Sequence, residues 1–274
     1  MARVDLHVHT TASDGGLSPS EAVFHARELG LSAIAVTDHD TAAGVAEAAA
    51  AGRQAGVEVV PGIEISIDYR GYGIHLLGYF INPDSPAMQR LLELVIAERW
   101  RRNDCIIEKM RADGIPISRE SLLHRFPDSV VGRPHFAAAL VEQGLAATVQ
   151  DAFARYLNRG CPYYEARRYI PVEDAFSVIR EAGGKAVFAH PLQYRFSEAE
   201  LEALTAFLTE RGAVGMECLY TGYSPAQVRR LRTLAEHFGL CITGGSDFHG
   251  SGKPRNPMGQ PEVPYGLLTA LRER

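Results

Sequence analysis

The sequence predicts an α/β fold interrupted by an all-helical insertion. Two observations lead to this expectation. Short apolar runs alternate with helical segments towards both ends of the chain, whereas the middle of the chain has helical periodicity alone. Such alternation is typical of a parallel sheet, with functional side chains at the carboxyl ends of its strands. With 274 residues, the chain can form one α/β barrel, or one core domain with an insertion.

The first strand is expected over Val4–Thr10, where apolar and polar residues alternate and place His7 and His9 on one face. Ser18 and Glu21 form a capping-box pair that begins a helix ending near residue 30. The remaining elements of this first part are a strand at 33–37, a helix at 41–55, a strand at 57–67 and the second arm of a hairpin at 74–80.

Residues 85–165 are expected to form the helical insertion, which would lie beside or above the barrel and recognise the substrate. A long charged helix over 88–112 opens it, and helices at 118–125, 134–143 and 149–157 follow. The barrel would therefore consist of residues 1–84 and 166–274. Its second part is expected to contain strands at 185–189, 214–219 and 240–243, helices at 171–182, 197–211 and 224–239, and a surface loop at 250–264 before a short last helix.

Composition excludes several classes of protein. The net charge of −5 provides no overall basic field for double-stranded DNA, so a phosphate-bearing ligand needs a local basic patch. The four cysteines form no Cys-x-x-Cys pair, which favours reduced thiols in the cytoplasm. The first strand leaves no room for a signal peptide, and no apolar run approaches a membrane span, so we expect a cytoplasmic protein without a membrane partner.

Imidazole and carboxylate side chains follow or end most of the expected strands, where they would converge on one mouth of a barrel. They are His7, His9, Asp14, His39, Glu64, His75, His190, Asp247 and His249. Nine such groups are too many for a single ion. Neutral imidazoles with carboxylates, and without cysteine, favour Mn²⁺, Fe²⁺ or Zn²⁺ over Ca²⁺ or a structural thiolate-bound zinc.

The motifs that carry these residues resemble those of the PHP family, named for polymerases and histidinol phosphatases. They are His-x-His near the N-terminus, Thr37-Asp38-His39, Gly62-Ile63-Glu64, the segment around His75, Ala189-His190-Pro191 and Ser246-Asp247-Phe248-His249. The resemblance implies a distorted seven-stranded (β/α)7 barrel with two or three divalent ions at its C-terminal mouth, Mn²⁺ being favoured. It implies one ion on His7, His9, Glu64 and Asp247, a second on Asp14, His39 and His249, and a third on Glu64, His75 and His190. Many relatives have histidine where Asp14 stands, so this chain departs from the family's pattern at a ligand of the second ion.

Motifs in the insertion resemble those of one subgroup of the PHP family. Gly132-Arg133-Pro134-His135-Phe136-Ala137 and the later segment 153–157 are similar to a PHP subgroup that removes the 3'-phosphate from nucleoside 3',5'-bisphosphates. Members of that subgroup also act as 5'-3' exoribonucleases on short RNA.

Several polar residues outside the ligand set are candidates for substrate binding or catalysis. Arg133 can form a fork onto a phosphate, and His135 can contact the transferred phosphate or protonate the leaving oxygen. Arg195, Lys253 and Arg255 are placed to add positive charge at the same mouth. For each of these, the alternative is a solvated side chain.

We expect other residues near the mouth to position ligands or to pack. Glu217 ends a strand there and is expected to orient a ligating histidine. Asp38 or Asp40 would orient His39, or one of Asp40 and Thr41 would cap the next helix. The tyrosines at 156, 163 and 164 could stack on a base, with packing against the barrel as the favoured alternative, and the histidines at 25, 124 and 237 have no partner motif.

The sequence therefore predicts a metal-dependent phosphatase that uses a metal-activated hydroxide and Asp247, Arg133 and His135 to remove the 3'-phosphate of a small nucleotide. Three alternatives remain open: a 5'-3' exoribonuclease on short RNA, a histidinol phosphate phosphatase, and a non-catalytic scaffold that keeps the metals and binds a partner protein. The sequence does not predict the oligomeric state.

Overall fold

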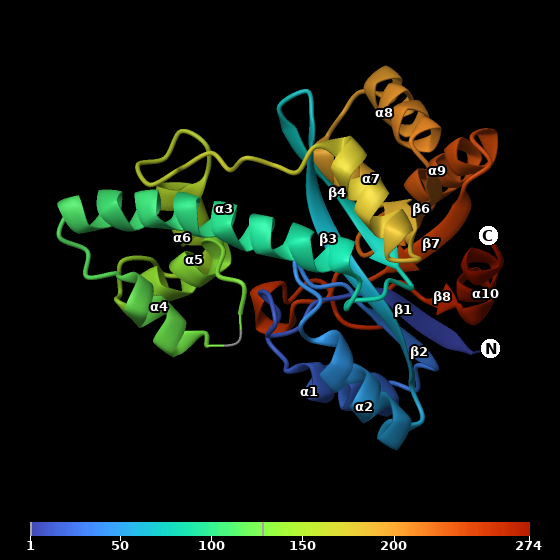
Figure 1. Cartoon of the computed structure of the whole chain (residues 1–274), viewed down its shortest axis with the longest axis horizontal. Helices are drawn as coiled ribbons and strands as arrows, with labels where there is room; N and C mark the ends of the chain where they lie inside the picture. Colours follow the sequence, from blue (N-terminus) through green and yellow to red (C-terminus); the bar gives the residue numbers. More distant parts are fainter. Residues whose placement is uncertain (1, 128) are drawn as a thin grey trace.

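The computed structural model describes residues 2–127 and 129–274, and the chain forms two adjoining bodies (Figure 1). One body is built around a curved sheet, and the other consists of helices that project to one side of it. The long helix α3 (Pro86–Ala112) runs from the first body into the second.

The sheet is a nearly closed barrel. Its strand order is β7-β6-β5-β4-β3-β2-β1-β8 in the described part of the chain. Pairing is parallel except for β3 with β4, β4 with β5, and β1 with β8. The barrel closes where Phe248 donates its N–H to the His7 carbonyl and accepts the His9 N–H. The strands are β1 (Arg3–Val8), β2 (Ala33–Val36), β3 (Glu58–Tyr69), β4 (Tyr72–Tyr79), β5 (Lys185–Phe188), β6 (Ala213–Tyr220), β7 (Cys241–Gly245) and β8 (Val263–Pro264).

This architecture confirms the predicted distorted barrel. All seven expected strands are present. The antiparallel strand β4 is the distortion, since an ideal (β/α) barrel has parallel strands only. The eighth strand, β8, was not predicted, because two residues give no periodicity. With buried Met258 and Val263, the segment 250–264 is also less exposed than the expected surface loop.

Helices cover the outside of the barrel, and most begin as the sequence predicts. Ser18, Ser197 and Ser224 each form a capping box with the residue three positions later. The prediction for α2 was wrong at its start: the helix begins at Val45, not at Thr41, so neither Asp40 nor Thr41 is its N-cap. The helices of this body are α1 (Pro19–Glu28), α2 (Val45–Ala55), α7 (Val172–Glu181), α8 (Glu198–Glu210), α9 (Pro225–His237) and α10 (Tyr265–Glu273).

The second body has its own hydrophobic core. Phe136, Leu140 and Leu157 pack there against the second half of α3. Tyr156 stacks on Tyr163 at 5.8 Å between ring centroids within this core. Both rings pack in the second body, whereas the sequence favoured packing against the barrel. Besides α3, this body contains α4 (Arg119–Arg125), α5 (Arg133–Glu142), α6 (Val149–Ala152) and a π-helical turn (Phe153–Leu157).

Helix α3 contributes to both cores. Met88, Leu91 and Val95 pack with the helices outside the barrel, and Ile106 and Met110 pack in the second body. The assignment of residues 85–165 to a separate substrate-recognition insertion remains a prediction, since α3 links the two bodies continuously. We keep the name insertion for residues 85–165.

Candidate active site

Four buried side chains face one another in the mouth of the barrel. His7 and His9 come from the end of β1, Glu64 from β3 and Asp247 from the turn after β7. His9 Nε2 lies 3.2 Å from Glu64 Oε2 and 3.3 Å from Asp247 Oδ1, and His7 Nε2 lies 3.4 and 3.6 Å from the same two oxygens. We call these residues the first ligand group. Their ligand atoms lie close enough together to hold one metal ion.

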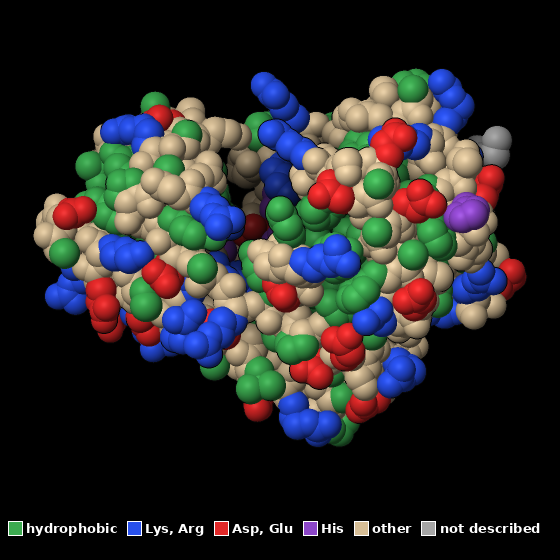
Figure 2. All heavy atoms as spheres, turned by 90° about the horizontal axis from the view of Figure 1, so that it is seen from above, with side chains coloured by type: hydrophobic (Ala, Val, Ile, Leu, Met, Phe, Trp, Pro, Cys, Tyr) green, Lys and Arg blue, Asp and Glu red, His purple; other side chains and the backbone are tan. Residues whose placement is uncertain are grey.

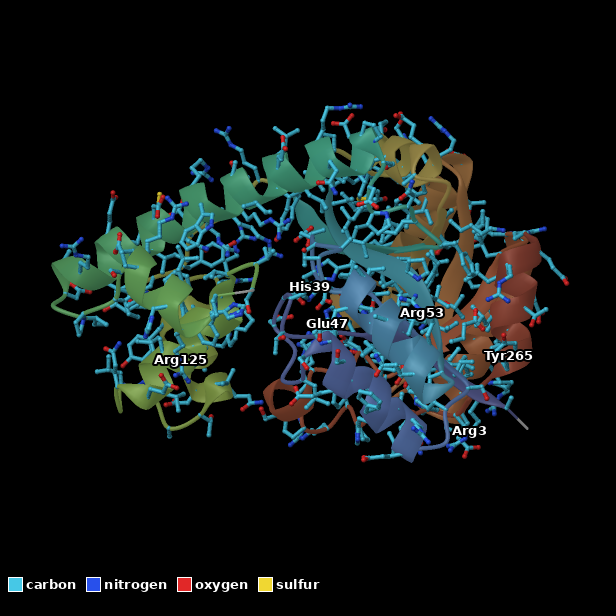
Figure 3. All side chains as sticks on the ribbon, turned by 60° about the horizontal axis from the view of Figure 1, so that its bottom comes forward. Arg3, His39, Glu47, Arg53, Arg125 and Tyr265 are labelled. Atoms are coloured by element: carbon cyan, nitrogen blue, oxygen red, sulfur yellow. The ribbon has the colours of Figure 1, made fainter. Side chains whose placement is uncertain are left out.

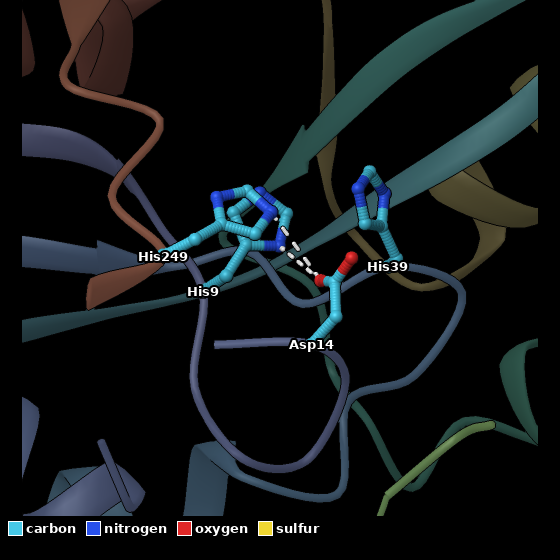
Figure 4. Close-up of side chains that lie close together, drawn as sticks. All are labelled: His9, Asp14, His39 and His249. Carbon is cyan, nitrogen blue, oxygen red and sulfur yellow. Dashed lines mark ion pairs between the residues drawn. The ribbon is translucent and has the colours of Figure 1, made fainter. Parts of the chain in front are cut away.

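A second ligand group consists of His9, Asp14, His39 and His249 (Figure 4). Asp14 Oδ1 lies 3.3 Å from His249 Nε2 and 3.9 Å from His9 Nδ1. The Asp14 carboxylate points between the rings of His9 and His249, with His39 on its other side. The sequence placed Asp14, His39 and His249 together; the structure adds His9, which belongs to both groups.

Glu64 is the centre of a third ligand group with His39 and His75. His39 Nδ1 lies 2.9 Å from Glu64 Oε2, and His75 Nδ1 lies 2.9 Å from Glu64 Oε1. His190 was expected in this group. Its Nε2 lies 2.8 Å from Glu64 Oε1, so it contacts the same carboxylate, and its role as a metal ligand remains a prediction.

The chemistry of these donors fits divalent metal ions. Six of the donor atoms are buried without a hydrogen-bond partner among the described residues: His7 Nε2, both nitrogens of His9, Glu64 Oε2, Asp247 Oδ1 and His249 Nε2. Buried polar atoms without partners are costly, and a shared cation removes that cost. Burial lowers the pKa of His75 and of His249 to about 4, so both rings are neutral at pH 7 and can coordinate a metal.

Residues behind the ligands fix their orientation. Glu217 on β6 is fully buried; its Oε1 lies 3.0 Å from His7 Nδ1, and its Oε2 accepts the His190 N–H at 2.7 Å. This confirms the role expected for Glu217. Asp247 Oδ2 accepts hydrogen bonds from the Tyr220 hydroxyl at 2.7 Å and from Lys253 Nζ at 2.8 Å, which leaves Oδ1 for the first ligand group.

Asp38 and Asp40 flank His39, but the expectation that one of them orients it was wrong. Asp38 accepts hydrogen bonds from Thr10 and Ser13, in the loop that leads to Asp14. Asp40 turns the other way, with a φ of 56°, and binds side chains of the insertion and the segment after it. A left-handed backbone at a non-glycine residue is costly and tends to occur at functional sites.

Four arginines surround a pocket of about 180 Å³ next to the ligand groups. Asp14, His39 and His75 of the ligand groups line it together with the arginines. Its other lining residues are Ser66, Pro134, Phe153, Tyr164, Glu165 and Tyr169. We call it the arginine pocket, and its arginines are Arg99, Arg102, Arg133 and Arg167. Figure 2 shows lysine and arginine atoms on the walls of the hollow between the two bodies, and Figure 3 places His39 at the edge of the barrel that faces the insertion.

The arginine pocket carries more positive than negative charge. Asp40 Oδ2 is the acceptor for both Arg99 and Arg167. Burial raises the pKa of Asp40, but these two guanidinium groups outweigh it and hold the pKa well below its ordinary value. Arg102 is 4% exposed, and within the described chain its guanidinium binds only Asn103 Oδ1, at 2.8 Å. Burial, with the charges of the other three arginines, lowers the pKa of Arg102 to about 9.

Two larger hollows adjoin the ligand groups. One, of about 560 Å³, lies between the barrel and α5 and has Phe126, Pro134, Ala138 and Phe153 on its walls; we call it the apolar hollow. The other, of about 540 Å³, is lined by His75 and His190 at its base and by Gln193, Lys253 and Arg255 at its rim; we call it the open groove. The ligand groups therefore border three compartments of different chemistry.

Known proteins are similar in sequence to this chain over nearly its whole length. A family model for the PHP domain matches residues 5–125. A 5'-3' exoribonuclease, Rnm, from Salmonella typhimurium is 38% identical over 247 residues, which cover 89% of this chain and 84% of the relative. The chain belongs to the PHP family. A 3',5'-nucleoside bisphosphate phosphatase from Chromobacterium violaceum, also similar to this PHP protein, is 33% identical over 96% of this chain and 92% of the relative.

Solved structures agree with the family. A protein from Bifidobacterium adolescentis described as a metal-dependent phosphoesterase superimposes with a TM-score of 0.88 at 33% identity, over 98% of this chain and 95% of the other. An amidohydrolase from Chromobacterium violaceum with bound sulfate gives a TM-score of 0.88 at 30% identity, over 99% and 96% of the two chains. This PHP chain is therefore a metal-dependent phosphoester hydrolase.

The predicted substrate-binding residues of this PHP enzyme lie in different places. Arg133 lines the arginine pocket, and Lys253 and Arg255 line the open groove. Arg195 is exposed and lines none of the three compartments. His135 borders the apolar hollow, but it accepts the Gly132 N–H at Nδ1, and its Nε2 lies 3.0 Å from the Ser13 carbonyl oxygen. Neither nitrogen is available to a phosphate in this conformation, and the catalytic role of His135 remains a prediction.

Sequence reasoning did not single out Arg99, Arg102 or Arg167 for the site. Arg99 and Arg102 are three residues apart and therefore share one face of α3, which is the only signal that could have paired them. Within the described residues, no helix is both long enough and apolar enough to cross a membrane.

Proposed function

We propose that this enzyme removes the 3'-phosphate from nucleoside 3',5'-bisphosphates and releases a nucleoside 5'-monophosphate. The observation that carries the proposal is the arginine pocket, which opens directly onto the ligand groups. Asp14, His39 and His75 belong to those groups and also line the pocket. Two sites that attract anions therefore lie side by side, as a substrate with two phosphates on one ribose requires.

The charge of the pocket supports a phosphate as its occupant. Four guanidinium groups line it, whereas Asp40 is the only carboxylate paired with any of them among the described residues. Arginine matches phosphate through paired N–H groups, and a phosphate dianion would relieve the repulsion among these buried charges. Histidinol phosphate carries a cationic amine in addition to its single phosphate, so this pocket would repel it.

The residues of the chain divide the work of such a reaction. Divalent ions held by the ligand groups, of which Mn²⁺ is the one we expect, would bind the oxygens of the 3'-phosphate and activate the attacking water. Arg102 and Arg133 would hold the 5'-phosphate and fix the ribose between the two sites. Lys253 would add positive charge on the open side, since its ammonium already lies 2.8 Å from Asp247 Oδ2.

The base would occupy the apolar hollow. This hollow shares Asp14, Pro134 and Phe153 with the arginine pocket, so a nucleoside fixed at both phosphates has it within reach. Phe126 and Phe153 provide aromatic surface on which any of the bases can stack.

A second candidate function is 5'-3' exonucleolytic cleavage of short RNA. The open groove favours it, because Lys253 and Arg255 line a path that leads away from the ligand groups, and Rnm-type relatives at 36–38% identity are named exoribonucleases. The bond cleaved would be the same, between phosphorus and the 3'-oxygen of a 5'-phosphorylated nucleoside. The groove would hold the remaining strand.

The test compares substrates that differ by one group. With Mn²⁺ added, we expect phosphate release from adenosine 3',5'-bisphosphate with a kcat/KM about 100-fold above that for adenosine 3'-monophosphate, which lacks the group that the pocket would bind. Equal rates on the two would contradict the assignment of the arginine pocket. A 5'-phosphorylated oligonucleotide assayed in parallel measures the second candidate function.

Two controls complete this test. Asp247→Asn removes a negative charge from the first ligand group and should abolish phosphate release while the protein remains folded. Reconstitution of metal-free enzyme with Mn²⁺, Fe²⁺ or Zn²⁺ identifies the active ion. Absence of hydrolysis of bisphosphates and RNA alike with every metal would favour the non-catalytic scaffold.

A further inference from the structure

The loop that presents Asp14 is held by the insertion through three consecutive carbonyl groups. Ser129 Oγ donates to the Thr11 carbonyl oxygen at 2.6 Å, and the Val130 N–H donates to the Ala12 carbonyl oxygen at 3.0 Å. His135 Nε2 lies 3.0 Å from the Ser13 carbonyl oxygen. These contacts join segments more than 115 residues apart in sequence, immediately before a member of the second ligand group.

The hydrogen bonds of His135 fix its tautomer. Its Nδ1 accepts the Gly132 N–H at 2.9 Å, so in the neutral ring the proton must lie on Nε2, which then donates to the Ser13 carbonyl. The ring is buried and packs edge-on against Phe126 at 4.5 Å between centroids. His135 is thus a rigid donor in the first turn of α5, aimed at the loop.

The barrel holds the same loop from its other side. Asp38 Oδ1 accepts the Thr10 N–H at 2.7 Å and the Ser13 hydroxyl at 2.6 Å. After Asp14 the turn is closed, since a Cβ on Gly15 would lie 2.3 Å from the His9 carbonyl oxygen. The barrel fixes the near side of the loop, and the insertion fixes the carbonyls on its outer side.

We propose that His135 and Ser129 are positioning residues for the second ligand group, so that docking of the insertion completes the metal centre. Without them, the loop would keep its bonds to Asp38 and the backbone bond from Val130, but it would lose two of the three contacts that fix its outer carbonyls. The Asp14 carboxylate would then no longer be held against His9, His39 and His249. The first ligand group contains no residue of this loop and would keep its ion.

This inference rests on the proposed metal site but not on the proposed substrate. It also gives the insertion a second role beside substrate recognition. Residues behind metal ligands commonly change metal affinity by about 10- to 100-fold when they are mutated, which sets the size of the effect to expect.

The experiment measures metal binding rather than turnover. Metal-free wild-type enzyme and His135→Ala are titrated with Mn²⁺ by calorimetry, and their electron paramagnetic resonance spectra are recorded. For wild type we expect at least two ions per chain and a spin-coupled spectrum. For His135→Ala we expect the first ion to bind as in wild type, the second to bind at least about tenfold more weakly, and the spectrum of an isolated ion to replace the coupled one.

Three variants make the result specific. His135→Gln keeps an N–H donor near the position of Nε2 and should recover part of the lost affinity. Ser129→Ala removes one hydrogen bond without touching His135 and should weaken the second ion in the same direction. His124→Ala alters an exposed histidine of α4 in the same insertion and should bind Mn²⁺ as wild type does.

The proposal is overturned if folded His135→Ala and Ser129→Ala both bind the second ion within about twofold of wild type. If His135→Ala does not fold, as judged by circular dichroism, Ser129→Ala decides the question alone. The outcome is separable from the proposed function. An enzyme inactive on bisphosphates can still lose its second ion in these variants, and an active one can retain it.

Discussion

Replacing Arg102 with methionine should raise the free energy of unfolding of the protein and weaken its binding of substrate. Arg102 is buried, and among the described residues its only hydrogen-bond acceptor is Asn103 Oδ1. Methionine has a similar length and packs in apolar surroundings without carrying a charge. The substitution therefore removes a costly charge and leaves the fold of α3 intact.

The pKa of Arg102 gives the size of the effect. It falls from the ordinary 12.5 to about 9 through burial and through repulsion from Arg99, Arg167 and Arg133. At 1.36 kcal/mol per pH unit, the charge costs about 5 kcal/mol as an upper bound, and replacement of buried charges by apolar residues commonly recovers about 1–4 kcal/mol. We expect Arg102→Met to raise the free energy of unfolding of the ligand-free protein by about 1–3 kcal/mol.

The same substitution should weaken substrate binding, because it removes a hydrogen bond from the guanidinium to the 5'-phosphate. A hydrogen bond to a charged partner contributes about 1.5–3 kcal/mol. KM for adenosine 3',5'-bisphosphate should rise about 10- to 100-fold, and adenosine 5'-monophosphate should no longer raise the melting temperature. Urea unfolding with and without the monophosphate, together with steady-state kinetics, measures both effects. Arg101→Met is the matched control, since Arg101 is exposed on the same helix and pairs with Glu98. A variant less stable than wild type, or one with unchanged KM, would refute the reasoning.

Three further predictions concern other parts of the site. Asp40→Asn leaves Arg99 and Arg167 without their carboxylate and should cost about 3–5 kcal/mol at pH 7. Because the pKa of Asp40 is lowered in the folded state, its contribution is complete above pH 4 and is lost on further acidification, so urea unfolding should show the gap between variant and wild type closing below pH 4. Ala138→Trp fills the apolar hollow and should raise KM for the bisphosphate at least about tenfold with a smaller change in kcat, measured by phosphate release; an unchanged KM would place the base elsewhere. Arg255→Glu reverses a charge in the open groove and should slow cleavage of a 5'-phosphorylated oligonucleotide more than that of the bisphosphate; equal slowing would argue against the groove as the path of the strand.

The sequence predicted the barrel well because its signals are local. Most strands are apolar runs, and the side chains that follow them, such as His39 after β2 and Asp247 after β7, must meet where parallel strands end. Glu217 could be placed in the same way, since it lies within β6 near the mouth. Periodicity and strand direction were enough to place these side chains at one mouth, whereas the distorted seven-stranded barrel and the division of the ligands among ions were implied by the resemblance to the PHP family.

The arginine pocket could not be predicted because its contacts are not local. Asp40 meets Arg99 across 59 residues of sequence, and Arg167 reaches the same carboxylate from the segment that leaves the insertion. In the sequence, Arg99 and Arg102 are two charges among many on a long amphipathic helix. Only the packing of α3 against the barrel distinguishes them from solvated residues such as Arg101.

The expected role of His135 shows the same limit. The motif around it suggested contact with a phosphate, but two backbone groups, the Gly132 N–H and the Ser13 carbonyl, take up its ring nitrogens. The Ser13 partner depends on how α5 docks on the loop after β1, and no spacing within the motif encodes that distance.

The continuity of α3 limits how the enzyme can open. Its 27 residues form a rod of about 40 Å, anchored at one end by Met88 and Leu91 and at the other by Ile106 and Met110. Arg99 and Arg102 lie near its midpoint. A helix fixed at both ends cannot bend sharply at its middle without breaking backbone hydrogen bonds. Nucleotides must therefore enter and leave past the edges of the hollow between the two bodies, while α3 stays in place. Lengthening α3 by one turn would move the two anchors apart by about 5.4 Å and change which ligands fit between the two phosphate positions.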